Sequence, residues 1–469
     1  MQKKLADFLF STRLTAVLFI VFAAAMAVGT FMDASSETSP TPYSRELIYN
    51  AWWFEAIMVF FVINFIGNIF RFRLYKKEKW ATLTLHLSFI LILVGAFVTR
   101  YIGYEGRMEI REGATENKFL SEHTYVTAFV DGDYVVDGVQ QRRVIPPKKV
   151  RLSERLDNNF TLETDYNGVP VKIAYKEFIK NAKESLVADV AGEGYLKIVE
   201  SGGGEKHDHW LQIGQVANIH NILFALNKPT QGAVNITYDE NDGSYSISAP
   251  FEGSFLNMAE LSAAGIEPGQ AMGNMEQFQR RFASDSVQPL MLRSLYNLAD
   301  MQFVIPDPVT VGRQGVVRAE APEQTNQDGL ILEVTAGNET KTVELLGGAG
   351  TAPDPTKVTV NGLDVYITYG SKEYELPFSI TLRDFIAEKY PGTEKNYKSF
   401  KSKLTVSDSD TEFFDTEVYM NHVLDHKGYR FFQASFNPDE KGTILSVNHD
   451  MWGTWITYIG YFLLYLGLM

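Results

Sequence analysis

The sequence predicts a multi-pass α-helical membrane protein, with about four spans, that carries a large β-rich extracytoplasmic domain. Three observations lead to this fold class. Four stretches approach the roughly 20 apolar residues that cross a hydrocarbon core. Basic residues gather beside these stretches, whereas most acidic residues lie in the long segment between the third stretch and the fourth. That segment consists largely of short runs in which apolar and polar residues alternate, as they do in half-buried strands.

The apolar stretches define the membrane region. They run from Leu14 to Phe31, Ala51 to Phe70, Ala81 to Thr99 and Met451 to Met469. Residues 1–100 are therefore a predicted three-span region, and residues 451–469 a fourth span. Glu55 lies near one end of its stretch beside two tryptophans, a composition typical of a membrane interface. Because no polar tail follows the fourth span, we expect a truncated or split chain with further sequence beyond Met469.

Charges in the short loops predict the orientation. Basic residues precede the first span and join the second to the third, at Lys3, Lys4, Arg13, Arg71, Arg73, Lys76, Lys77 and Lys79. Such loops face the cytoplasm under the positive-inside rule. Residues 101–450 are then expected on the periplasmic side of the inner (cytoplasmic) membrane.

Turn signals divide residues 101–450 into strands. Asp242-Gly243 and Asn361-Gly362 each lie between alternating runs, which is the signature of a tight hairpin. The segments at 330–345 and 428–447 have the same pattern. Between about 254 and 300 the spacing of apolar residues changes, and three helices are predicted there as an insertion near 258–265, 275–285 and 290–301.

Composition excludes several classes of function. The 469 residues include 57 Asp+Glu against 43 Lys+Arg, for a net charge of −14, so no nucleic-acid partner is expected. The chain has no cysteine, which excludes disulfides, thiolate metal sites and thiol redox chemistry within it. Nucleophile-elbow, phosphate-loop and zinc-protease motifs are absent from the sequence, so an autonomous hydrolase is not predicted.

His86 is the main candidate for a site. It lies about six residues into the third span, which at ~1.5 Å per residue is roughly 9 Å below the cytoplasmic surface of the membrane core. Ionisable groups at such depth usually serve a function, and neutral imidazole is a common haem-iron ligand. A metal ligand, a proton relay and a purely structural hydrogen bond stay open for His86. The other three spans contain no histidine, so a second axial imidazole would have to come from another chain or from further sequence.

Other histidines give weaker patterns. His207 and His209 are spaced i and i+2 and could hold a metal on a strand, but the glycine-rich surroundings favour an exposed loop. His422 and His426 would share a helix face, yet their sequence predicts strand, turn and strand. His123, His220 and His449 have no partner at a recognisable spacing, and a structural role is favoured for all of these residues.

Both ends of the chain resemble the ResB (CcsB) family of cytochrome c biogenesis proteins. The resemblance lies in residues 5–31, 49–72, 376–385, 418–436 and 442–467, and in the run HLSFILILVGAF that begins at His86. It is weak between about residues 130 and 355. It implies a CcsA-type membrane partner, separate or fused beyond the fourth span, with which the chain exports haem and assists its covalent attachment to apocytochrome c.

The resemblance also implies roles for individual residues. His86 aligns with a family histidine taken as an axial ligand to haem, and Arg71 and Arg73 are candidates to neutralise the haem propionates. No catalytic residue is predicted, and the chain alone is not expected to be an enzyme but part of a cytochrome c haem lyase complex. The alternative is a non-catalytic membrane-anchored binding or sensor protein. An outer metalloenzyme using His207 and His209 is a remote third hypothesis.

Overall fold

The computed structural model describes residues 2–34, 41–202, 205–257, 279–299, 301–320, 325–393, 396–408 and 413–469. These residues form two compact units. The first unit contains residues 1–182 and 318–469, and thus both ends of the chain. The second unit contains residues 183–317, which are inserted between the two halves of the first.

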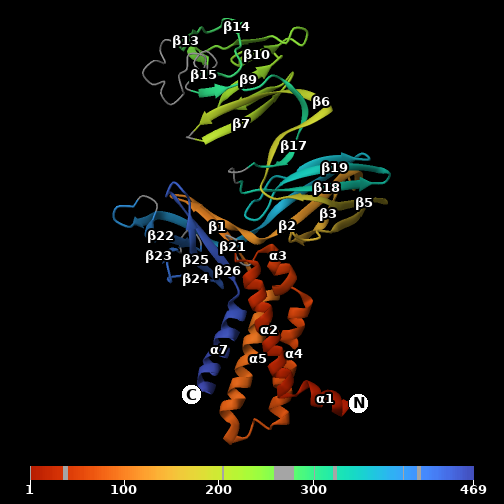
Figure 1. Cartoon of the computed structure of the whole chain (residues 1–469), viewed down its shortest axis with the longest axis vertical. Helices are drawn as coiled ribbons and strands as arrows, with labels where there is room; N and C mark the ends of the chain where they lie inside the picture. The colour runs from red at the N-terminus through yellow and green to blue at the C-terminus, as the bar shows by residue number, and fades with distance from the viewer. Residues whose placement is uncertain are drawn as a thin grey trace. The chain divides into compact units, whose positions relative to one another are not determined.

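The first unit begins with helices (Figure 1). Their bounds are α1 Gln2–Leu9, α2 Thr12–Met32, α3 Pro42–Ser44, the π-helix η1 Arg45–Tyr49, α4 Trp52–Arg71, the 3₁₀ turn η2 Lys77–Lys79, α5 Trp80–Tyr101 and α7 Met451–Leu468. Ser11 begins α2, because its side chain accepts a hydrogen bond from the amide of Leu14. Asp450 begins α7 in the same way by accepting from the amide of Gly453 at 3.1 Å.

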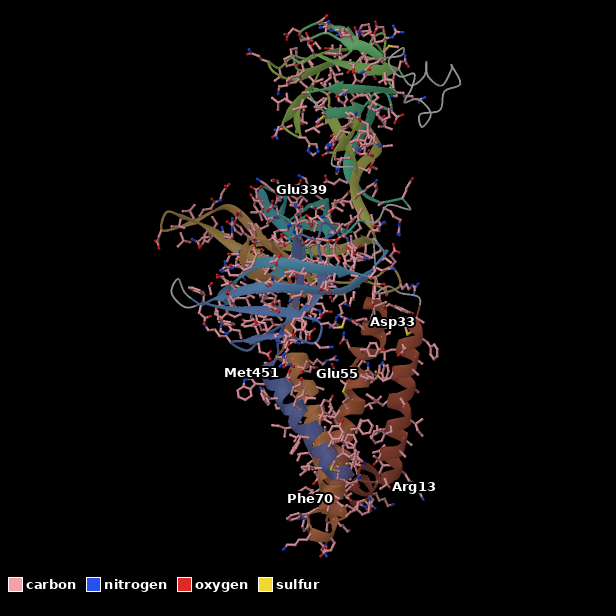
Figure 2. All side chains as sticks on the ribbon, turned by 90° about the vertical axis from the view of Figure 1, so that its left-hand side faces the viewer. Arg13, Asp33, Glu55, Phe70, Glu339 and Met451 are labelled. Carbon is pink, nitrogen blue, oxygen red and sulfur yellow. The ribbon has the colours of Figure 1, made fainter. Side chains whose placement is uncertain are left out.

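Three segments of the described chain are long and apolar enough to cross a membrane, namely Thr12–Met32, Trp52–Arg71 and Lys77–Tyr101. Helix α7 has 18 residues and packs along α5, but it is not among these three. Figure 2 shows Arg13 and Phe70 at one end of the helices and Asp33, Glu55 and Met451 at the other, next to the strands. The membrane-like helices and the β-rich part therefore meet at one end of the bundle.

A ten-stranded sheet follows directly from α5 and leads directly into α7. Its main order is β23-β22-β21-β2-β1-β26-β25-β24, with β20 and β3 attached to β21 and β2. The bounds are β1 Tyr104–Arg111, β2 Thr115–Val136, β3 Val139–Val150, β20 Thr356–Val360, β21 Leu363–Lys389, β22 Tyr397–Ser407, β23 Phe413–Tyr419, β24 Leu424–His426, β25 Tyr429–Phe436 and β26 Gly442–His449. Strand β1 pairs with β26 from Tyr104↔His449 to Arg111↔Gly442. This pairing holds the C-terminal end of α5 next to the N-terminal end of α7.

A four-stranded sheet completes the first unit, in the order β19-β18-β5-β4. Its strands are β4 Thr161–Tyr166, β5 Val169–Ile179, β18 Asp328–Ala336 and β19 Glu339–Gly347. The apolar faces of β5 and β18 pack against the second half of β2 and the first part of β21. The fully buried side chains there include Val130, Ile173 and Val365. A separate core, around Met108, Phe378 and Phe431, fills the part of the ten-stranded sheet nearest the helices.

The second unit consists of two sheets. One contains β6 Ala182–Gly202, β7 Glu205–Gln212, β12 Gly253–Asn257, β13 Gln279–Phe282, β15 Ser294–Leu298, β16 Met301–Val304 and β17 Thr310–Arg318. The other contains β8 Val216–Ile219, β9 Ile222–Leu226, β10 Val234–Tyr238, β11 Tyr245–Ser248 and β14 Gln288–Pro289. Their facing side chains form one core that includes Phe224, Tyr296 and Phe303.

Two predictions made from the sequence are wrong in this unit. Helices were predicted over 275–285 and 290–301, but the described residues there include strands β13 and β15 and the first residue of β16. Residues 258–278, including the helix predicted near 258–265, lie outside the described residues. His207 and His209 were expected in a loop and instead lie in strand β7, whose pairing with β6 satisfies its backbone groups.

Candidate functional site

His86 lies near the start of α5, two turns after Trp80 and half-buried. Its Nδ1 is 2.8 Å from the carbonyl oxygen of Thr82 in the preceding turn. Because a carbonyl oxygen only accepts, Nδ1–H must be the donor in this bond. The neutral imidazole then has its lone pair on Nε2, which is the form that binds a metal ion.

Aromatic rings surround one side of His86. Phe65 of α4 meets the imidazole edge-on with ring centroids 5.5 Å apart, and it stacks in turn on Phe61 and Phe89. These rings belong to a core cluster formed by α2, α4 and α5. The packing fixes the helix face on which His86 lies, so the structure provides an oriented imidazole beside a flat apolar wall.

Arg71 is the last residue of α4, and Arg73 lies just beyond it on the approach to α5. The Arg71 guanidinium donates to the carbonyl oxygens of Asp7 and Phe10, at 2.9 and 3.1 Å, and so connects α1 to the end of α4. Arg73 is exposed and has a positive φ of 50°, in the turn that reverses the chain. Within the described residues, no hydrogen bond or ion pair joins either arginine to His86. A role for them toward a haem stays a prediction.

At the opposite end of the helices lies a charged pocket of about 520 Å³. Its walls come from the end of α5, from η1 and from strands β1, β2 and β3, and they include Arg45, Glu55, Arg100, Glu122, His123, Lys149 and Asp450. Arg45 pairs with Glu122 at 2.7 Å, and Arg100 pairs with Glu55. Glu55 thus has a cationic partner, and the pocket combines paired charges from helices and sheet.

Two groups in the charged pocket have shifted pKa values. Partial burial, together with the nearby charge of Lys149, lowers the pKa of His123 to about 4. Loss of water around the ammonium group, together with Arg151 and Arg100, lowers the pKa of Lys149 to about 8. Burial opposes ionisation of Glu122, but the Arg45 hydrogen bond and charge hold its pKa below the usual range. His123 is therefore neutral at physiological pH.

This shift predicts a pH effect that His123→Gln removes. His123 has a lower pKa in the folded chain than the ordinary ~6.5, so between about pH 6.5 and 4 the unfolded chain binds a proton that the folded chain does not. The free energy of unfolding is therefore unaffected by this group above about pH 6.5 and decreases as the pH falls from there towards 4. Between about pH 7 and 4.5 the wild type is expected to lose on the order of 1 kcal/mol more than the variant, after discounting for partial exposure. Thermal unfolding at both pH values measures this.

His422→Gln is the matched control, because its side chain is exposed, its Nδ1 contacts the carbonyl oxygen of Glu417, and its ring stacks on that of Tyr419. It should keep the wild-type pH dependence. Equal pH dependence in wild type and His123→Gln would contradict the prediction.

A second pocket, of about 590 Å³, lies between the first two turns of α7 and strands β25 and β26. We call it the α7 pocket. Its lining is rich in aromatic and charged groups, and includes His426, Tyr429, Arg430, Phe432, Asp450, Trp455, Tyr458 and Tyr461. Arg430 forms a two-point ion pair with Asp425 and also contacts the Tyr458 hydroxyl. The lining residues of this pocket form no motif in the sequence, because they come from separate strands and a helix.

Residues 355–454 match the model of the ResB-like family. The resemblance to the ResB-like family is confirmed. This ResB-like segment contains β20 to β26 and the first residues of α7, and hence the strand wall of the α7 pocket. His422 and His426 lie in the segment within strand, turn and strand, as predicted.

The chain is also similar to Protein NrfI of Wolinella succinogenes. The two are 22% identical over 454 residues, which cover 97% of this chain and 33% of that relative. The chain therefore spans about a third of the length of the curated relative it matches. The similarity to NrfI extends well beyond the ResB-like segment. Helix α5, with His86, lies in the part of the chain that it covers.

Proposed function

We propose that this chain is a membrane subunit for cytochrome c biogenesis that exports haem and assists its covalent attachment to apocytochrome c. The observation that carries the proposal is the ResB-like segment at 355–454, together with similarity to NrfI over nearly the whole chain. The partner is a CcsA-type membrane protein, separate or fused. The thioether bonds form with thiols of the apocytochrome, so a chain without cysteine is no obstacle.

In this proposal α2, α4, α5 and α7 are four membrane spans, and the β-rich part faces the periplasm. The packing of α7 supports its place beside α5. Gly453, Gly460 and Gly467 recur every seven residues and all face α5, where a Cβ on Gly460 would lie 3.1 Å from the Ser88 carbonyl oxygen. Small residues that allow such close backbone contact are typical of helix pairs in membranes.

His86 supplies one axial ligand to the transported haem through Nε2. Its fit rests on the Thr82 hydrogen bond, which fixes the neutral tautomer, and on the apolar rings beside it. Arg73 and Arg71, at the same end of the bundle, neutralise the propionates. Since α2, α4 and α7 contain no histidine, the second axial ligand comes from the CcsA-type part.

An absorption spectrum tests the proposal. The chain is purified in detergent after co-expression with its CcsA-type partner, as wild type, as His86→Ala and as His86→Ala with added imidazole. We expect a reduced haem spectrum in the wild type, its loss in the variant and its return with imidazole, because free imidazole can fill the space that the side chain leaves.

His422→Ala is the control, since it removes an exposed imidazole from the ResB-like segment. It should keep the wild-type spectrum. An unchanged spectrum in His86→Ala would reject His86 as the ligand. Absence of haem from every preparation would favour the binding or sensor alternative.

A further inference from the structure

Two strands of the second unit bring a buried carboxylate and two imidazoles to one face. Strand β7 pairs antiparallel with β6, with Glu200 opposite His207 and Ile198 opposite His209. Side chains that are directly opposite, or two residues apart, share a face of a sheet. Glu200, His207 and His209 therefore lie on the same face as Ile198, which is the face that forms the core of this unit.

His220 approaches this face from the other sheet. It is the first residue of the two-residue turn between β8 and β9, and both turn residues, His220 and Asn221, have positive φ values of 47° and 66°. This is the conformation of a type I′ hairpin turn, and asparagine and histidine are among the non-glycine residues that adopt positive φ most often. The turn places the His220 ring 6.0 Å from that of His207 and 6.4 Å from that of His209, measured between centroids.

The side chains of Glu200, His209 and His220 come together where the β8–β9 turn meets this face. Glu200 Oε1 lies 2.8 Å from Nε2 of His220 and 3.6 Å from Nε2 of His209. One ligand atom from each of the three residues lies within 4.8 Å of the others. In a tetrahedral zinc site with metal–ligand bonds of 2.0–2.2 Å, two ligand atoms lie roughly 3.4 Å apart. The distances of 2.8 and 3.6 Å from Glu200 Oε1 lie on either side of that value.

Burial sets this cluster apart from an ordinary surface group of histidines. Glu200 is only 2% exposed, although a carboxylate in such a place needs a strong compensating partner. His209 Nε2 is buried and has no hydrogen-bond partner among the described residues. A buried nitrogen left without a partner beside a buried carboxylate is a costly arrangement that a bound cation would resolve.

We propose that Glu200, His209 and His220 bind a divalent transition-metal ion, with zinc as the ion that fits this donor set best. Two imidazoles and one carboxylate are the protein ligands of open zinc sites, in which water occupies the remaining position. The His220 side chain is more than half exposed, so an ion and its water can enter from that side. The site is independent of the haem proposal, because it uses no residue of the helices.

Zinc uptake by the full-length chain tests this site. The protein is purified in detergent without a polyhistidine tag, stripped with a chelator, and brought to equilibrium by dialysis against Zn²⁺ before elemental analysis. The wild type is expected to bind one ion per chain. His209→Ala and His220→Ala should each weaken binding on the order of a hundredfold or more, since even loss of an outer-shell partner costs 10–100-fold.

His422→Ala provides the matched control and should bind zinc as the wild type does. Thermal unfolding of the metal-free variants shows whether each is folded, and Co²⁺ absorption of the wild type reports nitrogen and oxygen ligands without any substitution. Equal zinc uptake by the wild type and by a His209→Ala/His220→Ala double variant would overturn the proposal. So would a wild-type chain that binds no Zn²⁺ after dialysis.

Discussion

Replacing Phe431 by alanine is expected to lower the free energy of unfolding of the first unit by about 4 kcal/mol, as removal of a buried phenylalanine ring does elsewhere. Phe431 is fully buried in β25, and its ring meets that of Phe378 with centroids 6.0 Å apart. The loss combines the transfer of the ring from water with the cavity left behind. Urea denaturation followed by near-ultraviolet circular dichroism measures it.

Phe432→Ala is the matched control, because this neighbouring residue points to the other face of β25 and is 40% exposed. The same substitution there should cost far less stability. Phe432 lines the α7 pocket, so the pair of variants also separates loss of the fold from loss of a pocket wall. Similar losses of stability in both variants would contradict the placement of Phe431 in the core.

Gly460→Leu is expected to destabilise the contact between α5 and α7 by about 3 kcal/mol, at the upper end of the usual cost of overpacking. A Cβ at this position would lie 2.8 Å from Ile92 Cγ1 and 3.1 Å from the Ile92 nitrogen. Because one of these contacts is with backbone, a side-chain rotation cannot relieve it, and the helices must separate. Thermal unfolding in detergent, followed by tryptophan fluorescence from α7, measures the effect.

Ile459→Leu serves as its control, since Ile459 is half-exposed on the outer side of α7. It should leave the unfolding temperature near that of the wild type. The haem spectrum of Gly460→Leu is informative as well, because His86 follows Leu85, which faces Gly467 on the same helix pair. A variant with unchanged stability would show that α7 does not pack closely on α5.

The hairpins were predictable because their signals are local. Asp242-Gly243 lies between β10 and β11, where Ile236 pairs with Ile247 and Tyr238 with Tyr245, as the alternation predicted. Asn361-Gly362 lies between β20 and β21 in the same way, with Val358 opposite Val365. Gly243 in the first turn and both Asn361 and Gly362 in the second have positive φ, which glycine and asparagine tolerate.

The helices predicted between 275 and 301 failed for the opposite reason. Leu295, Tyr296 and Leu298 have a spacing that suits a helix face as well as a strand, and pairing with β12 and β16 decides the outcome. Such pairing joins residues that are distant in the sequence, so local periodicity cannot detect it. Of the proposed zinc ligands, only His209 was a candidate from the sequence, paired there with His207, because Glu200 and His220 have no regular spacing to His209.

The role of His86 stays a prediction, and the sequence singled this residue out only because a membrane span limits the choice. His86 is identified by its depth in an apolar run, and the structure adds the hydrogen bond that selects its tautomer. The charged pocket and the α7 pocket combine the ends of α5 and α7 with strands from both ends of the chain. The lining of the charged pocket comes from several separate segments, whereas that of the α7 pocket lies almost wholly within residues 425–461 but contains no recognisable motif.

The pairing of β2 with β21 also determines the order in which the first unit can be completed. Strand β2 is synthesised soon after α5, but its partner residues Asp364 to Thr381 follow the whole of the inserted second unit. Non-local strand pairs form slowly, and an unpaired edge invites association with other chains. The nascent chain must therefore hold the edge of β2 unpaired on its membrane anchor while residues 183–317 emerge. A chaperone that covers this edge would act during synthesis, before residues 364–381 emerge.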